Sequence, residues 1–185
     1  IVFGLVGSEM CIRDSIIGGG VIGCSVAYHL SKLGWNDIVL LERKQLTSGT
    51  TWHAAGLIGQ LRASANMTKL AKYTQELYFD LEKETGVSTG FKRVGSISVA
   101  LTNERMEELK RSAAMARAFG VDVEEISPRE IKNRYPHINL ERVVGGVFLG
   151  KDGQGDPANI ALALAKGARQ ELSLIHISEP TRPNT

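Results

Sequence analysis

The sequence predicts an α/β fold organised around a glycine-rich turn between a strand and a helix. The apolar pair Ile16 and Ile17 leads into residues 18–23, where glycines form a G-x-G-x-x-G pattern. A helical pattern follows, and the apolar segment Ile38–Leu41 then closes on Glu42. This order of strand, glycine turn, helix, strand and acid is typical of a Rossmann-like dinucleotide-binding unit.

The glycines of this turn have separate physical roles. Gly18 can adopt the backbone angles that a tight turn requires. Gly20 has no Cβ, so a pyrophosphate can approach the main chain, and Gly23 allows the helix to pack closely on the strand. The free N–H groups at the start of the new helix, with the positive end of its dipole, would face that phosphate. Taken alone, the motif also fits a glycine turn with a purely structural role.

The residues after the second strand narrow the type of ligand. Glu42 lies about 20 residues beyond Gly23, where a carboxylate accepts hydrogen bonds from ribose hydroxyls. A carboxylate there disfavours a 2′-phosphate, which argues against an NADP-type ligand. Residues 47–56 then form a small, hydroxyl-rich loop in place of another helix and strand. Such a loop offers N–H and hydroxyl donors to a second anionic or polyol segment.

The segment from the turn through this loop resembles the FAD-dependent amine oxidoreductases of the D-amino-acid-oxidase fold. It is most similar to the dimethylglycine dehydrogenase and sarcosine dehydrogenase group. The matching residues are Gly18, Gly20, Gly23, Glu42 and the run 48–56, which contains T-W-H-A-A-G. The resemblance covers roughly residues 15–170. It implies a truncated Rossmann-like FAD-binding domain of the GxGxxG type, followed by the first part of an α+β substrate domain.

The resemblance also implies that His53 is joined covalently to the 8α-methyl carbon of the flavin. A neutral imidazole is a competent nucleophile near pH 7, and a histidyl linkage raises the oxidising power of a flavin. An ordinary polar loop residue is the alternative interpretation of this histidine. The residues expected to bind the cofactor are Gly18, Gly20, Val21, Ile22, Gly23, Glu42, Arg43, Ser48, Gly49, Thr50, Thr51, His53, Ala55 and Gly56.

The function that the resemblance implies is oxidation of the N-methyl C–N bond of a glycine derivative, dimethylglycine or sarcosine, by hydride transfer to FAD. The electron acceptor would be electron-transfer flavoprotein or oxygen, and tetrahydrofolate would bind a C-terminal part outside this segment. The location would be the mitochondrial matrix in a eukaryote and the cytoplasm in a bacterium. No catalytic base is identifiable, and we expect the 185-residue segment alone to be inactive. The alternatives are a catalytically inactive regulatory subunit of the same fold and a noncovalent FAD amino-acid oxidase.

The composition of the chain argues against several other classes of protein. The chain has 43% hydrophobic and 23% charged residues and a net charge of +2, an ordinary globular composition. No basic face with interleaved aromatics predicts nucleic-acid binding, and the apolar runs are too short for a membrane span. Cys11 and Cys24 are too few for a disulfide framework, and Cys24 is expected to be a small buried residue. The run from Asp152 resembles a calcium loop but has Ala163 at position twelve, so no metal site is predicted.

Later elements follow from spacing and capping signals. A helix over 66–85 places Leu70, Tyr73, Leu77 and Leu81 on one face. The other expected elements are a strand over 94–100, a helix capped by Thr102, a short strand over 122–126, a helix with a capping box at 127–130, a strand over 143–149 and a helix over 158–170 with Asp156 as cap and Pro157 at its first position. Arg62, Lys69 and His137 are expected to be surface residues, with contact to a phosphate or a substrate carboxylate as the alternative for Arg62 and Lys69.

The domain prediction assigns 16–89 to the FAD-binding domain, 90–150 to part of a substrate domain and 151–170 to a helix that returns to the FAD-binding domain. Residues 1–15 and 171–185 are expected to be non-native tails, translated from adaptor or assembly sequence. Charged and polar residues precede Ile16, where a central strand should be apolar, and Pro180 and Pro183 interrupt a possible strand over 172–177. Divergent natural termini are the alternative.

Overall fold

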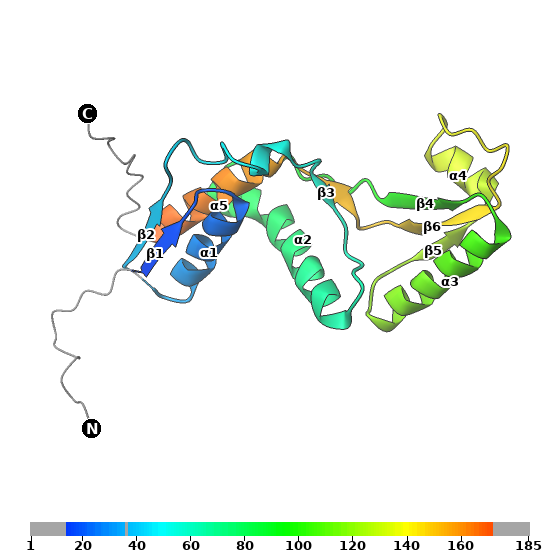
Figure 1. The fold of residues 1–185 in the computed structure, drawn as a ribbon, viewed down its shortest axis with the longest axis horizontal. Coiled ribbons are helices and arrows are strands. Elements are labelled where there is room, and N and C mark those ends of the chain that lie inside the picture. The colour runs from blue at the N-terminus through cyan, green and yellow to red at the C-terminus, as the bar shows by residue number, and fades with distance from the viewer. Residues whose placement is uncertain (1–13, 36, 172–185) are drawn as a thin grey trace, which may run out of the picture. The chain divides into compact units, whose positions relative to one another are not determined.

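The structure is a computed structural model that describes residues 14–35 and 37–171. The expected tails therefore lie outside the described residues, apart from Asp14, Ser15 and Glu171, as does the possible strand over 172–177. The described chain folds as two compact units, each built from separate segments (Figure 1). The first unit contains the described residues up to 55, then 80–90 and the residues from 156 onward. The second contains 56–79 and 91–155.

The first unit is built around the predicted strand, turn and helix. Strand β1 (Asp14–Ile17) leads into helix α1 (Val21–Lys32), and strand β2 (Ile38–Leu41) follows. The two strands are parallel, with Ile16 opposite Leu40. The short 3-10 helix η1 (Thr51–His53) comes next. The predicted order of elements is therefore confirmed.

Helix α5 (Pro157–Glu171) packs against α1 in the same unit. The interface uses small residues: Ala27 is fully buried, and a Cβ added at Gly167 would lie 2.7 Å from the Tyr28 ring. The beginning of α5 confirms the predicted cap, because Asp156 Oδ1 accepts hydrogen bonds from the N–H groups of Ala158 (2.9 Å) and Asn159 (3.0 Å). These contacts hold the C-terminal helix against the helix that begins at the glycine turn.

The second unit is built around an antiparallel sheet with the strand order β4-β6-β5. Its strands are β4 (Ser96–Ala100), β5 (Glu124–Ile126) and β6 (Gly145–Leu149). Helix α3 (Asn103–Ala118) packs on a core that includes Leu109 and Val147, and helix α4 (Pro128–Arg134) contributes Ile131 to a second core. A short pair, β3 (Leu57–Ile58) with β7 (Gly153–Gln154), lies in the same unit.

Both predicted caps in this unit are confirmed. The Thr102 side chain accepts a hydrogen bond from the Arg105 N–H at 3.2 Å. Ser127 and Glu130 form the reciprocal capping box: the serine hydroxyl accepts from the Glu130 N–H, and the carboxylate accepts from the Ser127 N–H. The three strands are shorter than predicted, since each begins two residues later than the predicted range.

Helix α2 (Ala65–Thr85) begins one residue before the predicted range, and its buried face was predicted wrongly in part. Leu81 is fully buried, whereas Leu70 and Tyr73 are 56% and 49% exposed. The fully buried positions in the first part of the helix are Thr68 and Gln75, both polar. Hydrogen bonds compensate this burial, since Gln75 Oε1 accepts from Gln60 Nε2 at 2.7 Å.

Asp152 is the buried carboxylate that joins three segments of the second unit. It is 8% exposed, and its Oδ1 accepts from the Gln60 N–H (2.8 Å) while Oδ2 accepts from the Ser96 hydroxyl (2.6 Å). Replacing Asp152 by alanine should lower the free energy of unfolding by about 2–3 kcal/mol, because both donors lose their acceptor. Urea unfolding followed by circular dichroism measures this. The exposed Asp122→Ala serves as the control with a much smaller effect, and equal effects of the two substitutions would contradict the prediction.

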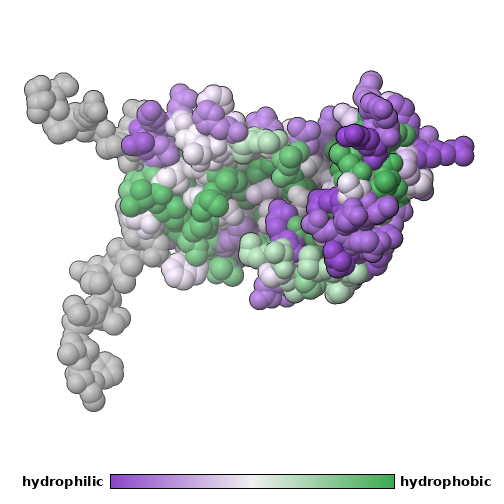
Figure 2. Space-filling model, turned by 45° about the vertical axis from the view of Figure 1, so that its right-hand side comes forward, coloured by the Kyte–Doolittle hydropathy of each residue, from purple (hydrophilic) through white to green (hydrophobic). Residues whose placement is uncertain are grey.

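Both units expose apolar side chains. Figure 2 shows a broad apolar area on the first unit, and the second unit exposes Leu57, Val94 and Leu101. The exposed apolar residues of the first unit include Ile17, Ile22, Val26 and Leu33. Three of these side chains belong to α1 or directly follow it. Within the described residues, no helix combines the length and the apolar character needed to cross a bilayer.

Candidate functional site

The glycine turn has the backbone geometry that the sequence predicts. Gly18 has φ +104°, a left-handed conformation that favours glycine, and its N–H donates to the Leu41 carbonyl at 2.8 Å. A Cβ added at Gly23 would lie 1.9 Å from the Gly18 carbonyl oxygen. The first turn of α1 can therefore approach the end of β1 only because residue 23 has no side chain.

The amino end of α1 has unused hydrogen-bond donors. Gly20 is the N-cap residue and has no side chain with which to cap the helix. The N–H groups of Ile22 and Gly23 have no hydrogen-bond acceptor among the described residues. Together with the positive end of the helix dipole, these groups fit a bound phosphate.

Glu42 binds the turn directly. Its Oε2 accepts from the Gly19 N–H at 2.7 Å, and its Oε1 accepts from the Lys44 N–H at 2.9 Å. These backbone hydrogen bonds, first that of Gly19, hold the pKa of the Glu42 carboxyl below its usual range. A carboxylate oxygen accepts more than one hydrogen bond, so Glu42 keeps acceptor capacity for hydroxyl donors.

The hydroxyl-rich loop is attached to the turn at two points. The Thr47 N–H donates to the Gly19 carbonyl at 2.9 Å, and the Val21 N–H donates to the Thr51 hydroxyl oxygen at 3.0 Å. Thr51 lies so close to the turn that a Cβ added at Gly20 would be 2.9 Å from its Oγ1. Thr47 has φ +71°, which is unusual for a residue other than glycine. Among the expected site residues, the structure thus brings together the turn, Glu42 and Thr51.

His53 lies at the end of η1, two residues after Thr51, and is exposed. Its ring is tilted by 36° against the Trp52 ring, with 4.0 Å between the centroids. The remaining expected loop residues are exposed or partly exposed: Arg43, Ser48, Gly49, Thr50, Ala55 and Gly56. The buried Thr51 therefore holds the loop to the turn, and the exposed His53 imidazole follows two residues later.

Sequence reasoning missed two residues that shape this site. Gly19 is buried, and its N–H and C=O bind Glu42 and Thr47, respectively. A Cβ added at Gly19 would lie 2.5 Å from a methyl carbon of Leu46. The motif treats this position as variable, so only the unusual run of three glycines signals its role. For Thr47 no sequence signal exists, because its contact is made by backbone atoms.

Cys24 is the buried thiol behind the turn. It is fully buried, its Sγ lies 3.7 Å from the Gly19 carbonyl oxygen, and burial raises its pKa from 9.0 to about 11. In a Cys11→Ser background, native Cys24 should react with iodoacetamide at pH 8 at least about 100-fold more slowly than in urea, because the shift lowers the thiolate fraction by about that factor and burial also blocks access of the reagent. Mass spectrometry of timed samples measures the rates. Similar rates in the native and unfolded protein would contradict the assigned environment.

The other predicted surface residues lie where expected, since Arg62, Lys69 and His137 are exposed. Among the described residues, no three His, Cys, Asp or Glu side chains gather as a metal site would require. The two oxygens of Asp152 are both engaged by protein donors.

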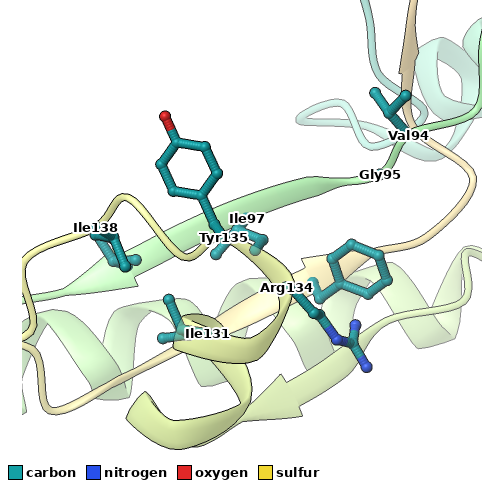
Figure 3. A pocket seen from close by; sticks show the side chains of 9 residues that line it. Val94, Gly95, Ile97, Ile131, Arg134, Tyr135 and Ile138 are labelled. Atoms are coloured by element: carbon teal, nitrogen blue, oxygen red, sulfur yellow. The ribbon is translucent and has the colours of Figure 1, made fainter.

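A separate pocket of about 700 Å³ lies on the α4 side of the sheet in the second unit (Figure 3). Aliphatic side chains such as Ile97, Ile131 and Ile138 line it. The Arg134 guanidinium stacks 4.0 Å from the centroid of the Phe148 ring and pairs with a glutamate outside the lining, so the pocket offers mainly apolar walls. Its walls therefore contrast with the polar turn and loop of the first unit.

Comparison with known proteins agrees with this geometry. The model of the family described as DAO, FAD dependent oxidoreductase, matches residues 15–176. Human mitochondrial sarcosine dehydrogenase is 43% identical over 154 residues, covering 83% of this chain and 17% of the human protein. Rat mitochondrial dimethylglycine dehydrogenase is 40% identical over 165 residues, covering 89% and 19%. The mouse mitochondrial regulatory subunit of pyruvate dehydrogenase phosphatase is 44% identical over 155 residues, covering 84% and 18%.

Solved structures show the same fold. L-proline dehydrogenase from P. horikoshii superposes with a TM-score of 0.81 and 27% identity, covering 88% of this chain and 43% of that one. Glycine oxidase from Bacillus cereus gives a TM-score of 0.72 and 27% identity, covering 86% and 44%. The chain thus spans less than half of these structures and less than a fifth of the curated relatives described above. With its glycine turn, acidic residue and histidine loop, the chain belongs to the family of FAD-dependent oxidoreductases of the D-amino-acid-oxidase fold.

Proposed function

We propose that the full-length protein oxidises the N-methyl C–N bond of a glycine derivative, dimethylglycine or sarcosine, with FAD as the oxidant. The observation that carries this proposal is the combination of a phosphate-type glycine turn with an exposed His53 on a loop hydrogen-bonded to that turn. Family membership and about 40% identity to sarcosine and dimethylglycine dehydrogenases support it. The alternative of a purely structural glycine turn would give no role to His53 on the loop that is attached to the turn.

The proposed roles of the residues follow from their contacts. The N–H groups of Ile22 and Gly23 would bind the diphosphate, and Glu42 would accept hydrogen bonds from the ribose of the adenosine. The loop from Ser48 to Gly56, with Arg43 beside it, would line the remainder of the cofactor. Bound FAD supplies the hydride acceptor, and the protein holds it and places the amine beside it.

We also propose the domain roles and partners. The FAD-binding domain would comprise residues 16–89 with the returning segment 151–170, and 90–150 would begin the substrate domain. The substrate is a small amine, and electron-transfer flavoprotein or oxygen reoxidises the flavin. Tetrahydrofolate would bind elsewhere in the full-length protein. The mitochondrial relatives support the mitochondrial matrix as its location in a eukaryote.

The covalent linkage of flavin to His53 has a direct test. The full-length protein should retain flavin fluorescence after acid precipitation and denaturation, and His53→Ala should abolish that fluorescence while still binding FAD reversibly. His137→Ala, which replaces another exposed histidine, should retain it. Flavin that dissociates completely from the wild-type protein on denaturation would instead indicate a noncovalent amino-acid oxidase.

A regulatory subunit is the second candidate, because the mouse phosphatase regulatory subunit is 44% identical to this chain. The presence of His53 in the loop favours the oxidoreductase. Anaerobic addition of dimethylglycine or sarcosine distinguishes the two. An oxidoreductase would reduce its flavin and so bleach the visible absorbance of the oxidised form, whereas a regulatory subunit would leave it unchanged.

A further inference from the structure

Thr51 is the buried part of an otherwise exposed loop. It is 7% exposed, while its neighbours Thr50, Trp52 and His53 are exposed. Its hydroxyl oxygen accepts a hydrogen bond from the Val21 N–H at 3.0 Å. That N–H is at the first position of α1, where the helix itself supplies no acceptor. Thr51 therefore caps a helix that precedes it by about 30 residues in the chain.

The backbone of η1 fixes His53 relative to Thr51. The His53 N–H donates to the Thr50 carbonyl and the Ala54 N–H donates to the Thr51 carbonyl, both at 3.2 Å. His53 therefore follows Thr51 within a single hydrogen-bonded turn. Any shift of Thr51 away from the amino end of α1 would carry the imidazole with it.

We propose that Thr51 is a positioning residue for the attachment of flavin to His53. Its hydroxyl holds η1 against the end of α1 that would bind the diphosphate, and so keeps the imidazole at a fixed distance from the bound flavin. This inference rests on the proposed linkage at His53. It extends that proposal by giving a role to a residue that does not itself react.

The chemistry of flavin attachment determines which two atoms the protein must hold close together. A bond forms between an imidazole nitrogen and the 8α-methyl carbon of the flavin, and one C–H and one N–H bond break. The two electrons and the two hydrogens remain with the flavin as its reduced form, and dioxygen reoxidises it with formation of hydrogen peroxide. The imidazole nitrogen would have to be held within bonding reach of that one carbon, and a displacement of about 1 Å from a reactive geometry costs about 100-fold in rate.

A simple phosphate-binding role for Thr51 makes a different prediction. Because its oxygen accepts from Val21, its own hydroxyl proton is available to a phosphate oxygen. Loss of such a contact would weaken FAD binding, whereas loss of a positioning contact would slow attachment at saturating FAD. Affinity and attachment rate therefore separate the two roles.

The test uses full-length apoprotein from riboflavin-starved cells, to which FAD is added. Intact mass and acid-stable fluorescence follow covalent attachment over time at saturating FAD, and fluorescence titration in the His53→Ala background measures reversible binding. Thr51→Val keeps the shape but removes the hydroxyl, and should slow attachment at least about 10-fold. Thr51→Ser should attach flavin within about threefold of the wild-type rate, since it restores the hydroxyl.

The hydrogen bond between Val21 and Thr51 can also be removed by replacing its donor. Val21→Pro removes the N–H donor at the first helical position, where proline is tolerated, and Gly20 already has the extended conformation that precedes proline. It should slow attachment as Thr51→Val does, and the double variant should be no slower than either. The matched control is Thr85→Val, which removes another buried hydroxyl of the first unit, one that donates to the Leu81 carbonyl at 2.7 Å. It should attach flavin at the wild-type rate.

Two results would overturn the inference alone: wild-type attachment rates in both Thr51→Val and Val21→Pro, or slow attachment that saturating FAD fully restores. A wild-type protein that acquires no acid-stable flavin would overturn the linkage at His53 as well. The failure of this inference is thus distinguishable from failure of the proposed function.

Discussion

Replacing Gly23 by alanine is expected to abolish measurable FAD binding and to destabilise the first unit. The added Cβ would lie 1.9 Å from the Gly18 carbonyl oxygen and 3.1 Å from the Gly18 carbonyl carbon. Both atoms belong to the backbone of the turn, so no side-chain rotation relieves the overlap. Either α1 moves away from β1 or the turn opens, and both changes displace the N–H groups that would face the diphosphate.

The expected loss of unfolding free energy is about 2–3 kcal/mol, as for other overpacked sites. Urea unfolding measures it, and flavin fluorescence titration measures FAD binding. Gly49→Ala is the control for stability, because a Cβ at that position would have no neighbour within 4 Å. A Gly23→Ala protein that binds FAD with wild-type affinity would show that the turn does not form the cofactor site.

The glycine turn was predictable because its requirements are local. Gly18 needs a left-handed backbone and Gly23 needs empty space, and both requirements follow from the motif and its flanking strand and helix. The caps at Thr102, Ser127 and Asp156 were predictable for the same reason. Each depends on a side chain that binds backbone groups two or three residues away.

The parts that sequence reasoning missed depend on contacts between distant residues. Periodicity predicted Leu70 and Tyr73 in the core, but hydrophobicity alone does not identify which side chains of α2 are buried. The burial of Gln75 is compensated from outside the helix, because Gln60 donates to its amide oxygen and the Ile58 carbonyl accepts from its amide NH₂. The sequence marks Thr51 only as a possible donor to the cofactor. Its role as an acceptor for α1 becomes visible only when the loop is placed on the turn.

Replacing Glu42 by glutamine is the second substitution for which we expect a large effect on FAD affinity and stability, because Glu42 connects the turn to the expected ribose site. Its carboxylate accepts from the N–H groups of Gly19 and Lys44 at 2.7 and 2.9 Å. In Glu42→Gln, an amide NH₂ must face one of these N–H groups, so one hydrogen bond is lost and two donors oppose each other. Hydrogen bonds to a charged group contribute about 1.5–3 kcal/mol, so the free energy of unfolding should fall by about that amount. Loss of the charged acceptor for the ribose hydroxyls should lower FAD affinity about 10- to 100-fold.

The direction of the Glu42 pKa shift also predicts how the effect of Glu42→Gln on the free energy of unfolding changes with pH. These two N–H groups hold the pKa of Glu42 below its usual value of 4.5. The carboxylate therefore stabilises the fold fully above the unfolded pKa, and this contribution is lost as the pH falls through the lower folded pKa. Glu42→Gln lacks the contribution at every pH. The difference in unfolding free energy between wild type and variant should be constant near pH 7 and should shrink below about pH 4.5.

Urea unfolding at a series of pH values, together with FAD titration at pH 7, measures both effects of Glu42→Gln. Glu141→Gln is the matched control, since it makes the same change of charge at an exposed residue of the second unit. It should leave FAD affinity unchanged. If both variants weakened FAD equally, the effect would come from net charge, and Glu42 would have no specific place beside the cofactor. A large effect confined to Glu42→Gln, with a stability difference that disappears in acid, requires the carboxylate to act through the two N–H groups of the turn.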